Sequence, residues 1–160
     1  MTTAYLLIGG NLGNRLLNLQ KAIEAIEEIC GDIIAMSSIY ETAAWGNIDQ
    51  PSFLNQVLVL NTDMQPEELM NHLLIIEEKL GRIRQEKMGP RTIDIDILLI
   101  DDVIIQTAAL TIPHPSIHLR KFALMPLAEV AASKIHPVIK KTIAELLTDC
   151  PDTLAVTKIS

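Results

Sequence analysis

Residues 92–100 place isoleucine or leucine at every second position, in the order Thr-Ile-Asp-Ile-Asp-Ile-Leu-Leu-Ile. A period of two predicts a β-strand, and nothing in this stretch suits an amphipathic helix. Because alternate residues of a strand point to opposite faces, Asp94 and Asp96 should share one face, roughly 7 Å apart. Their repulsion disfavours this arrangement unless cations bind there, so the strand predicts a divalent-metal site. The opposite face should carry Ile93, Ile95, Ile97 and Leu99, and the aspartate face should also carry Thr92, Leu98 and Ile100.

Apolar periodicity elsewhere predicts two helices and three more strands. The resulting order, β-α-β-β-α-β, is typical of the α+β ferredoxin-like fold, an antiparallel sheet with both helices on one face. Weaker helical patterns at 122–131 and 138–147 predict a C-terminal helical extension. The other face of the sheet is expected to be open to a ligand. The strands are predicted at 4–8, 33–42, 53–61 and 89–100, and the helices at 15–30 and 66–80.

Composition limits the class of protein. A length of 160 residues fits one domain, and 49% hydrophobic residues exclude disorder. The net charge of −7 argues against a nucleic-acid binder. No apolar run is long enough to span a membrane, and no secretory leader opens the chain, so a cytoplasmic protein without membrane contact is expected. Cys30 and Cys150 lack zinc or redox spacing and are expected to be reduced, buried thiols.

A basic segment runs directly into the aspartate strand. It contains Arg82, Arg84, Lys87 and Arg91, opposed only by Glu86. Taken alone, such a segment is more often a solvated turn. Beside paired carboxylates, however, it is what a metal–polyphosphate ligand would need.

Other motifs give weaker signals. The glycine cluster at 9–13 lacks the lysine and hydroxyl of a phosphate-binding loop and predicts only a tight turn before a helix. His114 lies between two prolines that would fix its position for a phosphate or nucleotide contact, although such histidines are more often structural. Phe53 and Asn55 share one strand face and suit a flat heterocycle, with core packing of Phe53 as the alternative. Trp45 is either a packed anchor or a lid residue.

Taken together, these residues resemble the 6-hydroxymethyl-7,8-dihydropterin pyrophosphokinase family of folate biosynthesis. The resemblance runs from residue 4 to about residue 127 and rests on six motifs in order. They are Ile-Gly-Gly-Asn-Leu-Gly at 8–13, Ser-Ile-Tyr-Glu-Thr at 38–42, Gln-Pro-Ser-Phe-Leu-Asn at 50–55, Gly-Arg-Ile-Arg at 81–84, Gly-Pro-Arg-Thr-Ile-Asp-Ile-Asp-Ile-Leu at 89–98 and Ile-Pro-His-Pro at 112–115.

The resemblance implies a ferredoxin-like enzyme, a single pyrophosphokinase domain over residues 1–160. Such a transferase moves the terminal pyrophosphate of ATP to the hydroxymethyl group of the pterin and releases AMP. It implies two Mg²⁺ ions on Asp94 and Asp96, with catalysis by these two aspartates, Arg82 and Arg91. The implied ATP contacts are Glu77, Arg82, Arg84, Arg91, main chain near Leu98, Thr111, His114 and Arg120. The implied pterin contacts are Thr42, Ala44, Trp45, Phe53, Asn55 and Phe122. A monomer that binds only these small molecules is expected.

The chain departs from the family pattern at three positions. Gly10 replaces a serine in the first turn, Met88 replaces an aromatic residue before Gly-Pro-Arg, and Ala109 replaces an arginine found in some relatives. A stacking contact over the pterin and one phosphate or nucleotide contact are therefore in question, but the reaction is expected to persist.

Two rival classes remain open from the residues alone. A palm-like nucleotidyltransferase also sets paired carboxylates on such a sheet, but it needs a basic polynucleotide track. A non-catalytic RNA- or ligand-binding ferredoxin-like module would present aromatic side chains on its strands. The aromatic content of 3% and the aspartate pair disagree with that module.

Overall fold

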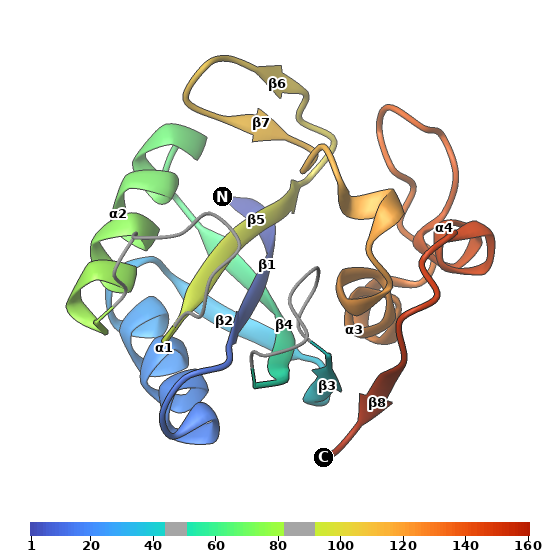
Figure 1. Ribbon diagram of the computed structural model, residues 1–160. Helices are drawn as coiled ribbons and strands as arrows, with labels where there is room; N and C mark the ends of the chain where they lie inside the picture. The colour runs from blue at the N-terminus through green and yellow to red at the C-terminus, as the bar shows by residue number, and fades with distance from the viewer. Residues whose placement is uncertain (44–50, 82–91) are drawn as a thin grey trace.

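A six-stranded antiparallel sheet forms the centre of the molecule, with helices on both sides (Figure 1). The computed structural model describes residues 1–43, 51–81 and 92–160. The sheet order is β5-β1-β4-β3-β8, and β2 pairs with β4 beside β3. The elements are β1 (Thr2–Gly10), α1 (Arg15–Ile29), β2 (Asp32–Met36), β3 (Tyr40–Thr42), β4 (Phe53–Thr62), α2 (Pro66–Lys79), β5 (Asp94–Ile100), β6 (Ile105–Gln106), β7 (Thr111–Ile112), the 3-10 helix η1 (Ile117–Leu119), α3 (Lys121–Ala131), α4 (Ile143–Asp149) and β8 (Val156–Lys158).

The predicted βαββαβ order is confirmed, and local capping chemistry explains where its helices begin. Asn14 caps α1 by accepting a hydrogen bond from the Leu17 amide at 3.1 Å. Pro66 occupies the first turn of α2, where its missing N–H costs nothing. The apolar sides of both helices pack against one face of the sheet, in a core that contains Leu19, Ile26, Leu69, Leu73 and Ile76.

The predicted strand at 33–42 is two strands, β2 and β3, with a break at 37–39. The side chain of Ser37 causes this break. Its hydroxyl accepts a hydrogen bond from the Val57 amide at 2.9 Å, where a regular ladder would use a main-chain carbonyl. Period-two patterning does not reveal a side chain that substitutes for the backbone in this way.

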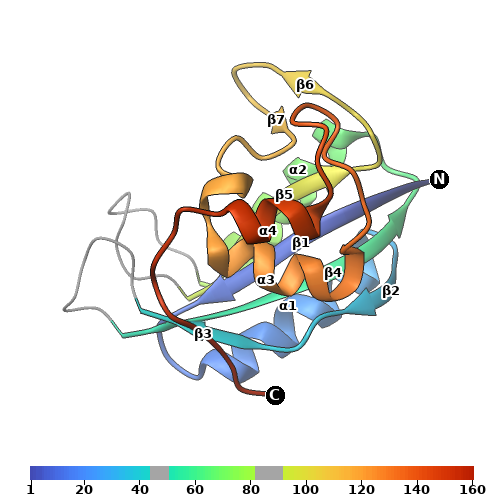
Figure 2. The ribbon, with the colours of Figure 1, turned by 90° about the vertical axis from the view of Figure 1, so that its right-hand side faces the viewer.

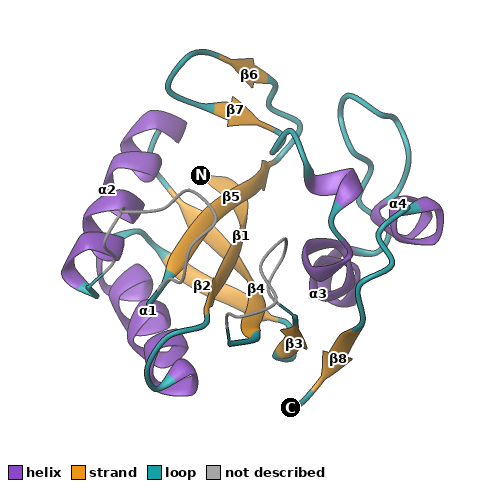
Figure 3. Cartoon of the chain, in the orientation of Figure 1, coloured by secondary structure: helices purple, strands orange, loops and turns teal. Residues whose placement is uncertain are grey.

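The sequence predicted that the second face of the sheet would be open. In the structure, part of this face is covered. Helices α3 and α4 lie against it and form a second core with Leu7, Val57 and Leu98 (Figures 2 and 3). The predicted C-terminal extension is thus present, and it covers part of the sheet. Helix α4 begins five residues later than predicted, because Thr142 and Glu145 form a capping box.

A β-bulge changes the faces of the last residues of β5. The pairing moves from Leu6↔Ile97 directly to Tyr5↔Leu99, so one residue of β5 is extra. As a result Leu99 packs in the core under α3 and α4, and Ile100 packs in the core under α1 and α2. The prediction was correct for Ile93, Ile95 and Ile97 but wrong for Leu99 and Ile100, because strict alternation fails at a bulge.

Two further sequence predictions can be compared with the structure. Both cysteines are free thiols, and Cys30 is buried as expected, whereas Cys150 is partly exposed. None of the helices in the described part of the chain has the length and apolar composition of a membrane span.

Candidate active site

Asp94 and Asp96 stand at the start of β5, on the face where α3 and α4 pack. Asp94 pairs with Gly9 of β1, and Asp96 pairs with Leu7. Cross-strand partners share a face, so both carboxylates lie on the same side of the sheet, as the sequence predicted. Both residues are partly exposed, so a ligand can reach their oxygens.

The main chain between these aspartates is held by Glu77 of α2. This side chain is only 1% exposed, and its Oε2 accepts a hydrogen bond from the Ile95 amide at 2.7 Å. The contact fixes the start of β5 from the opposite face of the sheet. Glu77 is the residue predicted at the nucleoside, and this bond gives it an additional role in supporting the aspartate strand.

His114 follows β7 and lies beside β5. Its amide donates to the Leu98 carbonyl at 2.9 Å, so the main chain predicted to meet the nucleoside also anchors this histidine. Burial and, to a smaller extent, the positive charge of Arg120 lower the pKa of His114 to about 4, although the charge of Asp94 opposes the shift. The imidazole is therefore neutral at pH 7. Because its Nδ1 accepts from the Ser116 amide at 3.1 Å, Nε2 carries the proton and is the donor.

The start of α3 brings a predicted ATP residue next to a predicted pterin residue. The Arg120 guanidinium lies 5.7 Å from the centroid of the Phe122 ring, a cation–π distance. Phe122 also packs against the second core, which limits its movement. Thr111, another predicted nucleoside contact, is partly buried in β7.

Polar side chains are buried where β3 pairs with β4. Thr42 is 4% exposed and Asn55 is 6% exposed. Within the described residues, the Thr42 hydroxyl is one of two buried side-chain oxygen atoms without a hydrogen-bond partner. A buried hydroxyl without a partner is unfavourable unless a ligand supplies one.

Gly9 joins the two groups of residues. It pairs with Asp94 on one side and with Asn55 on the other, and Asn55 pairs in turn with Tyr40. A Cβ atom on Gly9 would collide with Asn55 Oδ1, so the missing side chain is what lets this amide lie over β1. Two strand spacings separate Asp94 from Asn55, a distance of about 10 Å. The predicted metal and pterin residues therefore lie in one row across the sheet.

Two hydrogen-bond groups near this row were not predicted as functional. The Glu129 carboxylate of α3 accepts from the Tyr40 hydroxyl at 2.7 Å and from the Ser38 amide and hydroxyl. These bonds lower the pKa of Glu129 against the opposing effect of its burial, and burial with the Glu129 bond raises the pKa of Tyr40 to about 12. The second group joins Arg15, Glu41 and Ser52. No sequence signal links residues this far apart.

Five predicted site residues, Arg82, Arg84, Arg91, Ala44 and Trp45, lie outside the described residues. Of the others, the structure brings Asp94, Asp96, His114 and Arg120 toward one end of the sheet, where Thr42, Phe53, Asn55 and Phe122 also gather. Within the described ranges 1–43, 51–81 and 92–160, no group of three or more His, Cys, Asp or Glu side chains is placed to hold a metal ion.

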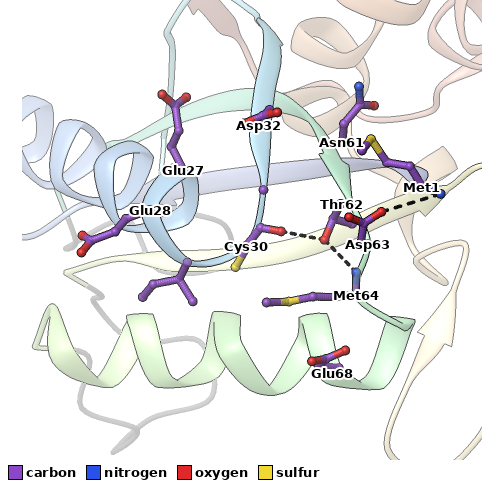
Figure 4. A pocket seen from close by; sticks show the side chains of 12 residues that line it. Met1, Glu27, Glu28, Cys30, Asp32, Asn61, Thr62, Asp63, Met64 and Glu68 are labelled. Atoms are coloured by element: carbon purple, nitrogen blue, oxygen red, sulfur yellow. Dashed lines mark hydrogen bonds and ion pairs between the residues drawn. The ribbon is translucent and has the colours of Figure 1, made fainter.

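A separate hollow of about 400 Å³ lies at the opposite end of β1 and β4 (Figure 4). Thr62 is engaged there, donating to the Cys30 carbonyl at 2.6 Å and accepting from the Met64 amide at 3.1 Å. Carboxylates dominate its rim, which includes Glu27, Glu28, Asp32, Asp63 and Glu68.

The model of the 7,8-dihydro-6-hydroxymethylpterin-pyrophosphokinase (HPPK) family matches residues 5–132. The chain belongs to this family. It is 43% identical over 145 residues to the 2-amino-4-hydroxy-6-hydroxymethyldihydropteridine pyrophosphokinase of Aquifex aeolicus, covering 91% of this chain and 90% of that protein. The enzyme of the same name from Haemophilus influenzae is 37% identical over 153 residues, covering 95% of each chain.

Solved structures of HPPK proteins share this fold. Plasmodium falciparum HPPK-DHPS with pterin and p-hydroxybenzoate has a TM-score of 0.76 at 20% identity. An HPPK-DHPS in complex with substrates has a TM-score of 0.76 at 17% identity. Each comparison covers 92% of this chain but only 41% and 43% of the larger proteins, so the chain spans less than half of their length.

Membership in the HPPK family makes this chain an enzyme, a kinase of folate biosynthesis. It transfers the pyrophosphoryl group of ATP to hydroxymethyldihydropterin, which confirms the activity predicted from the sequence. The nucleotidyltransferase and non-catalytic alternatives are thereby set aside.

Proposed function

We propose that this HPPK chain carries out the transfer on the sheet row formed by Asp94, Gly9 and Asn55. ATP lies over the β5 end of the row, and the pterin lies over the β3–β4 end. The observation that carries the proposal is Gly9, which pairs with both residues and leaves room for the Asn55 amide. Direct transfer of a pyrophosphoryl group from ATP to the pterin requires the two substrates to lie side by side, and this row offers neighbouring places for them.

Asp94 and Asp96 fit Mg²⁺. Magnesium prefers hard oxygen ligands and is usually held by one or two carboxylates together with substrate phosphates. The partly exposed aspartate pair supplies two such carboxylates. The two Mg²⁺ ions, when bound, neutralise charge that develops on the phosphate oxygens.

The proposed ATP contacts that lie within the described residues bind the nucleotide and orient it. His114 is a neutral donor at Nε2, and Arg120 adds a positive charge beside it. Glu77, Thr111 and the main chain at Leu98 face the nucleoside, and Glu77 also keeps the aspartate strand in place. The proposed phosphate contacts also include Arg82, Arg84 and Arg91, because these residues match the family motifs. Arg82 and Arg91 are further proposed to take part in catalysis.

The pterin is a flat heterocycle edged with hydrogen-bonding atoms, and the pocket chemistry fits it. Thr42 and Asn55 offer buried polar groups, and the Thr42 hydroxyl has no partner among described residues. Phe53 and Phe122 offer aromatic surface for stacking. Ala44 and Trp45 complete the proposed set from their matching motif.

The reaction needs no side-chain nucleophile. The hydroxymethyl oxygen of the pterin attacks the β-phosphorus of ATP and loses its proton. A new O–P bond forms, the bond between the β-phosphorus and the α–β bridging oxygen breaks, and AMP leaves. The chain's own contribution is to align the substrates and to stabilise the transferring group with cationic side chains.

Nucleotide products test the proposal. With Mg²⁺ and ATP present, adding 6-hydroxymethyl-7,8-dihydropterin should release one AMP for each pterin consumed, and EDTA should stop the release until Mg²⁺ is restored. Release of ADP, or AMP release that does not require the pterin, would contradict it. We further propose that residues 1–160 act as one monomeric domain, which light scattering during gel filtration can check.

A further inference from the structure

Arg15, Glu41 and Ser52 form a hydrogen-bonded group that we name the Arg15 clamp. Arg15 Nη1 lies 2.7 Å from Glu41 Oε2 and also donates to the Ser52 carbonyl at 3.0 Å. The Ser52 hydroxyl lies 3.1 Å from the same nitrogen and donates to Glu41 Oε2 at 2.9 Å. The bonds from Arg15 and Ser52 lower the pKa of Glu41, so the clamp holds an ionised carboxylate at neutral pH.

The clamp sits immediately beside two proposed pterin residues. Glu41 precedes Thr42 at the end of β3, and Ser52 precedes Phe53 at the start of β4. Thr42 and Phe53 are register partners, so the clamp spans the last pair of the β3–β4 ladder. It therefore ties together the two strand ends that carry these side chains.

The clamp acts from the side of the sheet opposite the pterin residues. Glu41 alternates with Thr42 along β3, so the two side chains point to opposite faces. Arg15 reaches Glu41 from the first residue of α1, and α1 packs on the face opposite α3. The clamp thus touches neither substrate and can influence the pterin only through the position of Thr42 and Phe53.

The ladders beside these strand ends are short. β3 makes three residue pairs with β4 and three with β8, and both ladders stop at Thr42, so the clamp joins the strands where the regular pairing ends. A second bond comes from the turn before α1, because Asn11 Nδ2 donates to the Pro51 carbonyl at 3.0 Å. This turn and the first residue of α1 are therefore attached at two successive residues, Pro51 and Ser52, to the chain that enters β4.

We propose that the Arg15 clamp is a positioning device for the pterin, which sets pterin affinity by fixing Thr42 against Phe53 and leaves ATP binding unchanged. This inference rests on the proposed placement of the pterin. Arg15 and Glu41 are 31% and 35% exposed, so water and salt weaken their attraction. The expected effect is accordingly modest, about fivefold in pterin affinity.

Arg15→Met and Glu41→Gln test the clamp, because each removes one charge and nearly preserves side-chain size. Pterin-dependent AMP release should show KM for the pterin raised about fivefold, with kcat and KM for ATP within twofold of wild type. The double variant should show no larger effect than either single variant, because each already breaks the pair. Added salt should raise the wild-type KM for the pterin but not that of the variants.

Lys141→Met is the matched control. It breaks the Lys141–Asp149 pair, which has a similar length of 2.9 Å and lies in the C-terminal helical region. Unchanged KM values in this variant, with raised pterin KM in the clamp variants, support the inference. Unchanged pterin KM in the clamp variants, an equal rise in KM for ATP, or unfolding of both clamp variants overturns it.

Failure of the clamp inference can be distinguished from failure of the proposed function. A wild-type chain that releases no AMP counts against that function. Calorimetric titration with the pterin and a non-hydrolysable ATP analogue still compares the clamp variants with wild type. Equal pterin affinities in that titration would overturn the clamp inference by themselves.

Discussion

The two ends of the central sheet both carry carboxylates, but they differ in what surrounds them. At one end Asp94 and Asp96 lie near the partly buried, neutral His114 and Arg120, and farther along the same face of the sheet the Thr42 hydroxyl has no hydrogen-bond partner among the described residues. At the other end the acidic hollow is rimmed by exposed carboxylates, and Thr62 is satisfied by its own main-chain neighbours (Figure 4). Clustered acids alone therefore do not make a site; the aspartate end differs in the neutral histidine and the arginine beside it and in the unsatisfied buried hydroxyl on the same face of the sheet.

The aspartates should give the largest effect. Replacing either aspartate with alanine should lower kcat/KM by about 1,000-fold. The proposed Mg²⁺ ions would lose a ligand, and the charge on the ATP phosphates would no longer be neutralised. Asp32→Ala and Asp63→Ala at the other end should stay within twofold of wild type. The measurement is pterin-dependent AMP release, with circular dichroism to confirm folding. Near-normal rates in Asp94→Ala or Asp96→Ala would remove the distinction between the two ends.

A pair of glycines sharpens the comparison. An added Cβ collides with Asn55 Oδ1 at Gly9 and with the Asn61 carbonyl at Gly31, which also has a φ of +150°. Both alanine variants should lose roughly 1–3 kcal/mol of unfolding free energy. Only Gly9→Ala should also weaken pterin binding, by about tenfold, because it displaces the Asn55 amide. Denaturant titration and pterin calorimetry measure the two effects, and equal pterin affinities in the two variants would contradict this assignment.

Acid should destabilise the end that contains His114. The folded-state pKa of His114, about 4, lies below the usual 6.5, so the unfolded chain takes up a proton first as the pH falls. The stability that His114 contributes is complete above pH 6.5 and is lost as the pH falls toward 4. Buried His136 also has a lowered pKa and contributes in the same direction.

Unfolding free energies at pH 7 and pH 4.5 can isolate the His114 contribution. His114→Gln should reduce the loss on acidification by roughly 1–2 kcal/mol. His72→Gln on α2 serves as the matched control and should leave the loss unchanged. A full wild-type loss in His114→Gln would show that this ring does not control the acid response.

The acidic hollow should give the smallest effect. Glu28→Gln or Asp63→Asn should change the unfolding free energy by less than about 0.5 kcal/mol, because exposed charges interact weakly through water. Asp63 illustrates the point, since its contact with the N-terminal amine is 3.8 Å long and highly exposed. Any change should disappear in 0.5 M salt. A loss of catalytic activity in either variant would show that this end also serves the reaction.

The sequence was most informative where a pattern is local. Period-two and helical spacing predicted the βαββαβ order, and alternation placed Asp94 and Asp96 together on one face. Alternation failed at Leu99 and Ile100, because a bulge depends on the pairing with β1. It also failed at Ser37, whose hydroxyl replaces a backbone acceptor.

The sequence by itself thus determined the order of elements, the aspartate pair and the family motifs, since neighbours along a strand or helix fix these features. Only the tertiary structure decided that α3 covers part of the second face, that Gly9 makes room for Asn55 and that Arg15 reaches Glu41. These contacts join residues distant in the chain. They exist because hydrophobic packing brings separate elements together, and no local period encodes which side chains then meet.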